Sequence, residues 1–160
     1  KNNWVESGAK FSPDGNSVVT SIQTSLSDSI NRSGNAEIFL FNLKDSTSIQ
    51  LTEIKGFNAL PSFSPNGKNI AFHRCINNNC DIYVMNADGS SIKNLTKNTT
   101  DSRWPRWTPD GKWIVYTRSV DSNSDIYFIS TNGKIIKPII NSTYKDEIAE
   151  IRPAGKKNDR

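Results

Sequence analysis

The sequence predicts an all-β protein built from three copies of one four-stranded antiparallel unit. Two observations lead to this prediction: a five-residue motif returns three times, and short runs of β-forming residues alternate with turns rich in Asn, Ser and Gly. No stretch shows a convincing helical period of 3.6 residues. The hydrophobic fraction of 34% also favours a turn-rich β protein over a helical bundle or a membrane protein.

Length and charge exclude several classes of protein. The 160 residues predict a single domain over residues 1–160. No apolar run approaches the roughly 20 residues that a membrane helix needs, so we expect no membrane span. The formal net charge is +4, and apart from a short cluster at 156–160 the basic residues are spread along the chain. Nucleic-acid sites normally need a stripe of Lys and Arg, so we expect no nucleic-acid partner.

The repeated motif is an aromatic residue followed by Ser/Thr-Pro-Asp/Asn-Gly. It stands at residues 11–15, 63–67 and 107–111. Pro fixes φ near −65°, Asp or Asn tolerates left-handed geometry, and Gly accepts a positive φ without steric cost. Each tetrapeptide therefore predicts a tight reversal between two strands.

The strands that follow each reversal recur with a period of 44 residues. A second strand-like run starts at Glu37, Asp81 and Asp125, which are spaced by 44 and 44. The motifs themselves stand 52 and then 44 residues apart, so the first repeat carries eight extra residues. We assign them to a solvent-exposed hairpin loop around residues 25–35.

The expected strands follow from these positions. They span 7–12, 17–24, 36–42 and 48–52 in the first repeat, 59–64, 68–74, 81–86 and 91–96 in the second, and 104–108, 112–118, 125–130 and 134–140 in the third. The repeats thus occupy about 7–52, 59–96 and 104–140, and a decayed start of a fourth repeat falls at 148–156.

Four strands in 44 residues match one blade of a β-propeller, whose repeat is about 40 to 45 residues. The motif Phe-Ser-Pro-Asp/Asn-Gly, the run Asp-Ile-Tyr-Val-Met-Asn-Ala-Asp-Gly-Ser at 81–90 and Asn-Leu-Thr at 94–96 resemble the WD40-like repeat of the TolB family. The resemblance covers residues 7 to about 140. It implies a β-propeller in which the first strand of each blade lines a central channel. It also implies a protein that acts by binding other proteins or by shielding an attached hydrolase.

Three blades cannot close a ring, because propellers have about 4 to 8 blades and the TolB type usually has six. We therefore expect a propeller segment of three blades with an apolar face exposed at each end. Either the chain is a piece of a longer protein, or a second copy forms a homodimer and completes a six-bladed ring.

Cys75 and Cys80 flank the predicted loop between the second and third strands of the second repeat. They can face each other across a hairpin at disulfide distance. A disulfide predicts an oxidising compartment, the periplasm or the cell exterior. Two free thiols are the alternative, and a metal site is disfavoured because further Cys or His ligands are lacking nearby. We expect no metal and no cofactor.

His73 is the sole histidine, so any mechanism that needs a histidine must use it. The aligned repeats place Ser21 and Thr117 at the same position, which indicates a structural or surface role. We therefore expect no catalytic residue.

Two charged positions recur between repeats. Glu37, Asp81 and Asp125 begin the third strands of separate blades, so we expect them to accept backbone N–H bonds in their own loops rather than share a metal. Arg74 and Arg118 match each other, and we expect each to pair with a carboxylate of a neighbouring loop rather than with a substrate.

The aromatic residues divide into core and candidate interface. Phe11, Phe63 and Trp107 are expected in the cores between blades because of their repeat position. Arg103 and Trp104 are expected on the loop that enters the third repeat, at a rim of the channel, where Ala59 and Leu60 stand in the second repeat. Trp beside Arg is typical of protein-binding hot spots, and packing against the next blade is the alternative. The candidate binding residues are Arg103, Trp104, Asp101, Phe57 and Asn58.

The function expected from the sequence is a non-catalytic protein-interaction scaffold of the TolB-like type, located outside the cytoplasm. The alternative is the propeller portion of a larger hydrolase of the prolyl oligopeptidase type, which would gate substrate access. A Gly-x-Ser-x-Gly nucleophile motif would favour a hydrolase, and this sequence has none. A sugar-processing propeller would need aromatic platforms with a metal or an acid pair, which we do not find.

Overall fold

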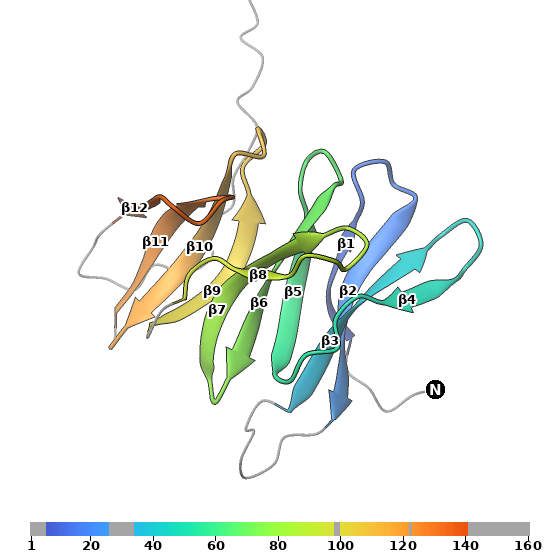
Figure 1. Ribbon diagram of the computed structural model, residues 1–160, viewed down its shortest axis with the longest axis horizontal. Helices are drawn as coiled ribbons and strands as arrows, with labels where there is room; N and C mark the ends of the chain where they lie inside the picture. The colour runs from blue at the N-terminus through green and yellow to red at the C-terminus, as the bar shows by residue number, and fades with distance from the viewer. Residues whose placement is uncertain (1–5, 26–33, 98–99, 122, 141–160) are drawn as a thin grey trace, which may run out of the picture.

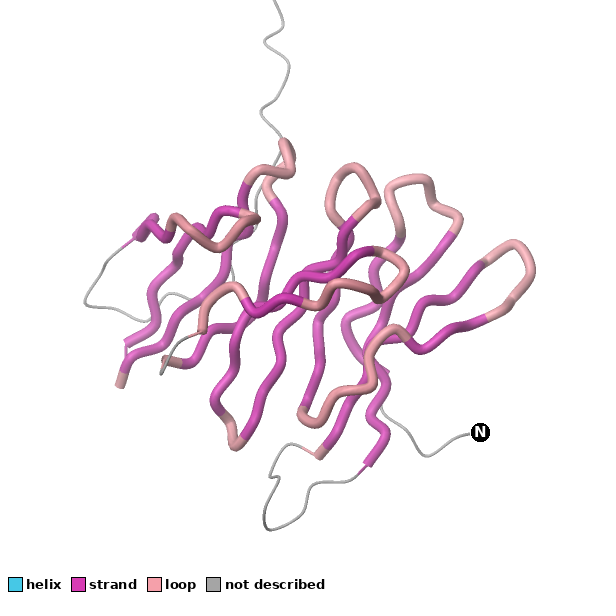
Figure 2. Tube along the Cα trace, viewed as in Figure 1, coloured by secondary structure: helices cyan, strands magenta, loops and turns pink. Residues whose placement is uncertain are grey.

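The computed structural model describes residues 6–25, 34–97, 100–121 and 123–140. Within these ranges the chain contains twelve strands. Figure 2 shows the strands joined by turns and loops. The described ranges contain no helix that could span a membrane. The all-β class predicted from the sequence is therefore confirmed.

The twelve strands form three antiparallel blades of four (Figure 1). Blade one contains β1 (Glu6–Phe11), β2 (Ser17–Ser25), β3 (Asn35–Asn42) and β4 (Ser48–Gln50). Blade two contains β5 (Phe57–Phe63), β6 (Asn69–Ile76), β7 (Asn79–Asn86) and β8 (Lys93–Asn94). Blade three contains β9 (Asp101–Trp107), β10 (Trp113–Val120), β11 (Asn123–Ser130) and β12 (Ile136–Ile140).

The blades stand side by side and the sheets stay open. Blades one and two join at a single parallel bridge between Ala36 and Phe57, whereas blade three is a separate four-stranded sheet. The arrangement is a partial propeller, as predicted. Residues 26–33 of the predicted inserted loop and the predicted fourth start at 148–156 lie outside the described residues.

The three predicted reversals each join the first and second strands of a blade, at what we call the turn end of the molecule (Figure 1). In blade one the Gly15 N–H donates to the Ser12 carbonyl over 2.9 Å, and Gly15 has a φ of 74°. The Ser17 N–H donates to the Ser12 hydroxyl oxygen over 2.9 Å. The same bonds recur in blades two and three, where Ser64 and Thr108 replace Ser12. The local chemistry of Ser/Thr, Pro and Gly thus fixes all three turns.

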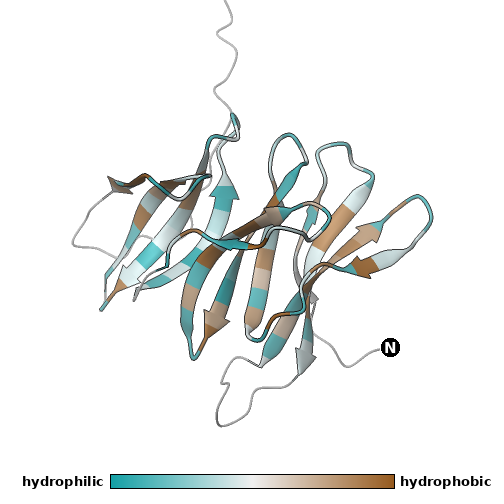
Figure 3. Cartoon of the chain, viewed as in Figure 1, coloured by the Kyte–Doolittle hydropathy of each residue, from teal (hydrophilic) through white to brown (hydrophobic). Residues whose placement is uncertain are grey.

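The cores lie between the blades, and Figure 3 shows that apolar residues follow the strands. Successive residues of β6 face opposite blades: Ile70 and Phe72 pack toward blade one, and Ala71 packs toward blade three. The first cluster contains Val19, Ile38, Leu51, Ile70, Phe72 and Met85. The second contains Ala71, Ile82, Leu95, Ile114, Tyr116 and Ile129.

The aromatic residues of the motif differ in burial. Phe63 packs against the first cluster and Trp107 against the second, as expected. The expectation for Phe11 was wrong, because its side chain is 69% exposed. The described residues include no blade that precedes blade one and covers this side chain.

Candidate binding surface

The hairpin between β6 and β7 forms part of the opposite end of the blades, which we call the hairpin end (Figure 1). Asn77 and Asn78 form its turn with φ values of 52° and 65°, the left-handed geometry of a two-residue hairpin. Cys75 and Cys80 stand directly opposite each other, with Cα atoms 3.9 Å apart, and form a disulfide. The predicted disulfide is confirmed.

Blade three holds this hairpin through Asp101 and Arg103. The Cys80 N–H donates to Asp101 Oδ1 over 3.0 Å. Arg103 Nε lies 2.7 Å from Asp101 Oδ2 in an ion pair, and Arg103 donates to the Asn78 carbonyl over 2.9 Å. These charge-assisted bonds fix the hairpin against the start of β9. About a third of each side chain stays exposed, 32% for Arg103 and 28% for Asp101.

Trp104 lies within strand β9 and not on a loop, so the predicted loop placement of Arg103 and Trp104 was wrong. Its φ is 57°, and Leu60 and Gly8 have φ values of 50° and 72° at the same repeat position. The pairing register shifts there in each blade, which marks a β-bulge in every first strand. A left-handed backbone costs a non-glycine residue roughly 1–2 kcal/mol. Trp104 keeps this conformation with a half-buried side chain.

Asn58 and Phe57 lie at the junction of blades one and two, apart from the Arg103 group. Asn58 is 0% exposed, and its Nδ2 donates to the carbonyls of Ala36 and Ile54 over 2.9 and 3.0 Å. Because it is buried in bonds within the chain, Asn58 joins two blades and offers no surface to a partner. This corrects its proposed binding role. Phe57 is half-buried beside the bridge to Ala36.

A polar groove lies at the hairpin end between blades two and three, with a volume of about 380 Å³. The β6–β7 hairpin, the start of β9 and the β10–β11 hairpin form its walls. Its lining residues are Asn77, Asn78, Asn79, Thr100, Asp101, Ser119, Val120 and Asp121. Of the candidate binding residues, Asp101 is the one that lines this groove. Sequence reasoning missed the groove because it depends on how two hairpins of different blades lie side by side.

In blades one and two the repeated carboxylate anchors a threonine that follows the fourth strand. Glu37 accepts a hydrogen bond from the Thr52 hydroxyl, whose oxygen accepts the Ile38 N–H over 2.9 Å. The Ile54 N–H also donates to Glu37, as the predicted backbone bonding requires, and burial raises the pKa of the Glu37 carboxyl.

Asp81 repeats the arrangement in blade two. The Thr96 hydroxyl donates to Asp81 over 2.5 Å and accepts the Ile82 N–H over 3.1 Å. The sequence predicted that these carboxylates accept backbone N–H bonds. It did not predict that each also accepts a bond from a threonine hydroxyl. In blade three the matching position is Ile140, which has no hydroxyl. Among the described residues no group of three or more His, Cys, Asp or Glu side chains could hold a metal ion.

His73 is buried between blades two and three, with 4% of its surface exposed. Burial, together with the nearby charges of Arg103 and Arg106, lowers the pKa of the imidazole to about 3. Ser21 and Thr117, at the same repeat position, are 1% and 2% exposed. This position is structural in all three blades.

Arg74 and Arg118 share one structural role: each contacts a tyrosine ring and an oxygen of a loop, and the charge of Arg74 also acts on the Glu37 carboxyl. Arg74 lies over the ring of Tyr83 at 5.7 Å and donates to the Lys55 carbonyl over 2.8 Å. Arg118 lies over Tyr127 at 5.3 Å and donates to the Thr100 hydroxyl over 3.0 Å. Each guanidinium thus joins its blade to the loop that enters it.

Comparison with known families decides the classification of this fold. A family model described as the TolB beta propeller domain matches residues 30–158. The chain belongs to the TolB β-propeller domain family. No curated protein matches it significantly.

Solved structures agree with this assignment. TolB from Acinetobacter baumannii is 26% identical with a TM-score of 0.65, over 85% of this chain and 32% of that one. The putative TolB from Agrobacterium tumefaciens is 20% identical with a TM-score of 0.69, over 88% and 50%. The β-propeller domain of the trilobed protease from Pyrococcus furiosus is 18% identical with a TM-score of 0.65, over 88% and 44%. The chain therefore spans about a third to a half of these relatives.

Proposed function

We propose that this chain is a non-catalytic scaffold that binds another protein at the hairpin end of blades two and three, in a compartment outside the cytoplasm. Trp104, which follows Arg103 in β9 and so lies next to the residue that bonds the β6–β7 hairpin, is the observation that carries this proposal. A large aromatic side chain stays half-buried on a left-handed residue, where the other blades have Gly8 and Leu60. The fold does not require Trp at this position, because Leu60 adopts the same left-handed backbone in blade two. Trp beside Arg103 has the composition of an interface hot spot.

The state of His73 supports a non-catalytic role. A general acid or base needs a pKa near the working pH and contact with the substrate. His73 has neither property, because it is 4% exposed and its pKa is lowered to about 3. The disulfide between Cys75 and Cys80 supports the extracytoplasmic compartment, since disulfides persist in oxidising environments.

Photo-cross-linking tests the binding site. A photoreactive phenylalanine analogue replaces Trp104 in one sample and Lys134, an exposed residue of the turn between β11 and β12, in the control. In an extract of the source cell's envelope, we expect one protein to cross-link from position 104 and not from position 134. Wild-type chain should compete for it and the W104L variant, which carries the residue of blade two, should compete at least about tenfold less well. Equal competition by W104L would refute the proposal.

We further propose that a second copy supplies the missing blades. The support is Phe11, an inter-blade residue by repeat position that is 69% exposed on blade one. Light scattering of the 160-residue chain should give about twice its mass of 17.9 kDa. A mass of one chain at every concentration would contradict this.

A role as the propeller portion of a larger hydrolase is the second candidate. Its support is the likeness to the protease propeller from Pyrococcus furiosus. An antibody against this chain would isolate the native protein, and a fluorophosphonate probe would then label an attached serine hydrolase. Labelling of the isolated protein favours the hydrolase, and its absence in a protein of intact mass favours the scaffold.

A further inference from the structure

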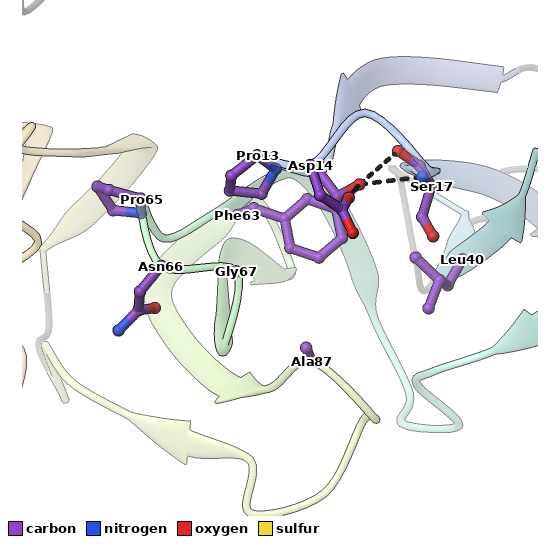
Figure 4. A pocket seen from close by; sticks show the side chains of 10 residues that line it. Pro13, Asp14, Ser17, Leu40, Phe63, Pro65, Asn66, Gly67 and Ala87 are labelled. Carbon is purple, nitrogen blue, oxygen red and sulfur yellow. Dashed lines mark hydrogen bonds between the residues drawn. The ribbon is translucent and has the colours of Figure 1, made fainter.

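A second pocket opens at the turn end between blades one and two. Its volume is about 360 Å³, within the range of roughly 300–1,000 Å³ that is typical of ligand sites. Figure 4 shows the ring of Phe63 inside it, with Pro13 and Asp14 from the β1–β2 turn close by and Leu40 and Ala87 on other sides. The other lining residues are Ser12, Ser17, Pro65, Asn66 and Gly67.

The two blade junctions share one scaffold at this end. A Cβ atom on Gly67 would lie 3.6 Å from Pro13 Cδ, and one on Gly111 would lie 3.5 Å from Pro65 Cδ. Each turn glycine therefore packs against the proline of the preceding turn. The spacing of neighbouring turns is thus similar at both junctions, and differences between them come from side chains.

The side chain that differs most is the motif's aromatic residue. At the junction of blades two and three this residue is Trp107, whose Nε1–H donates to the Ser62 carbonyl over 3.1 Å. At the junction of blades one and two it is Phe63, which has a smaller ring and no N–H group. We attribute the pocket to this difference, because a phenyl ring leaves open part of the space that an indole fills.

The pocket continues along blade one. A neighbouring cavity of about 180 Å³ shares Ser17 and Leu40 with it and reaches Ile49, which is 52% exposed. Because the two cavities share these lining residues, we treat them as one groove beside the β3–β4 hairpin. A groove of this kind suits an extended segment better than a compact small molecule.

The charge of the groove defines its ligand. Among the described residues that line the two cavities, Asp14 alone is charged. Hydrogen bonds from the Ser12 hydroxyl and the Asn16 backbone hold the pKa of Asp14 below its usual value, so it is an anion at neutral pH. Phe63, Leu40 and Ala87 supply apolar surface beside this anion.

We propose that this groove binds a peptide segment that places an apolar side chain on Phe63 and a neighbouring Lys or Arg against Asp14. The groove lies at the opposite end of the blades from the hairpin-end surface. The proposal therefore stands independently of the proposed function.

Titration followed by NMR tests this with two tetrapeptides, acetyl-Ala-Leu-Lys-Ala-amide and its Glu counterpart. The Lys peptide should shift resonances of the groove and bind at least about fivefold more tightly than the Glu peptide, because the Asp14 carboxylate attracts Lys and repels Glu. F63W, which copies Trp107, should fill the pocket and weaken binding at least about tenfold. D14N, which copies Asn66, should remove the preference for Lys.

A87L is a second variant that should fill the pocket, and it is used if F63W does not fold. Leucine is chosen because Leu43 occupies the same repeat position in blade one. Urea unfolding of each variant shows whether the fold is kept. Equal binding of the Lys and Glu peptides, or wild-type binding by folded F63W or A87L, would overturn the proposal. Self-association of the chain that F63W abolishes would assign the groove to a second copy and would also overturn it.

Discussion

His73 should make the stability of this protein depend on pH between pH 6.5 and about pH 3. Its pKa falls from 6.5 in the unfolded chain to about 3 in the folded one, because burial and the charges of Arg103 and Arg106 disfavour the imidazolium. Between pH 6.5 and pH 3, the imidazole of His73 is therefore protonated in the unfolded chain and neutral in the folded chain. The contribution of the neutral His73 side chain to the free energy of unfolding is complete above pH 6.5 and is lost as the pH falls toward 3.

The magnitude follows from about 1.4 kcal/mol for each pH unit. Between pH 7 and pH 5, His73 should remove about 2 kcal/mol from the free energy of unfolding. Asp14 and Asp110 have lowered pKa values and lose their stabilising effect only below about pH 4, outside this window. Glu37, whose pKa is raised, acts in the opposite direction but equally in wild type and variant.

The assay is urea unfolding at pH 7 and pH 5, followed by tryptophan fluorescence, for wild type and for H73T. Threonine is the residue that blade three uses at this position, Thr117, which is 2% exposed. Wild type should lose about 2 kcal/mol more than H73T between the two pH values. NMR offers a direct check, since the chain has one histidine. Parallel pH dependence of the two proteins, or titration of His73 near pH 6.5, would refute the reasoning.

Three further predictions concern the blades. Removing the disulfide with C75S/C80S should lower the free energy of unfolding by about 2 kcal/mol, the chain-entropy value for so short a loop. Equal urea midpoints of wild type with and without reductant would contradict this. T96V should cost about 2–3 kcal/mol, because Asp81 and the Ile82 N–H each lose the bond to the Thr96 hydroxyl. T47V removes an exposed hydroxyl and should change the stability by no more than about 0.5 kcal/mol in the same urea assay. G89A should destabilise more than G15A in thermal unfolding: both residues have positive φ, but a Cβ on Gly89 would lie 2.8 Å from the Leu51 carbonyl oxygen and one on Gly15 meets nothing within 4 Å. Equal losses in G89A and G15A would show that the close approach has no effect.

Local chemistry explains what the sequence predicted well. The Ser/Thr-Pro-Asp/Asn-Gly turns bond within five or six residues, so their geometry follows from the residues themselves. The disulfide was predictable for the same reason, because a two-residue turn places Cys75 directly opposite Cys80. The period of 44 residues then allowed each strand of one blade to be placed in the next blade.

The missed features depend on contacts between blades. Nothing in the residue types of Leu60 and Trp104 signals a left-handed backbone, and Gly8 alone hinted at the bulge in the first strands. Asn58 has the polarity of a surface residue, yet four oxygens of this chain surround its amide nitrogen. Phe11 shows the reverse case, since its repeat position predicts burial that only a preceding blade could provide.

The repeated threonine was visible in the sequence, but its role was not. Thr52 and Thr96 recur with the period, and sequence reasoning read them only as strand ends. Their hydroxyls instead connect a buried carboxylate to the backbone of the third strand. The side-chain geometry that creates this link lies outside any pattern of hydrophobicity or turn propensity.

Hydrogen–deuterium exchange with the cross-linked partner added back tests the central claim most directly, because it maps where a protein binds this scaffold. We predict slower exchange in the β6–β7 hairpin at 76–80, the start of β9 at 100–104 and the β10–β11 hairpin at 119–121, with unchanged exchange in the turns at 12–15 and 64–67. Protection confined to the turn end, or no change at the hairpin end, would contradict a partner-binding surface at the junction of blades two and three.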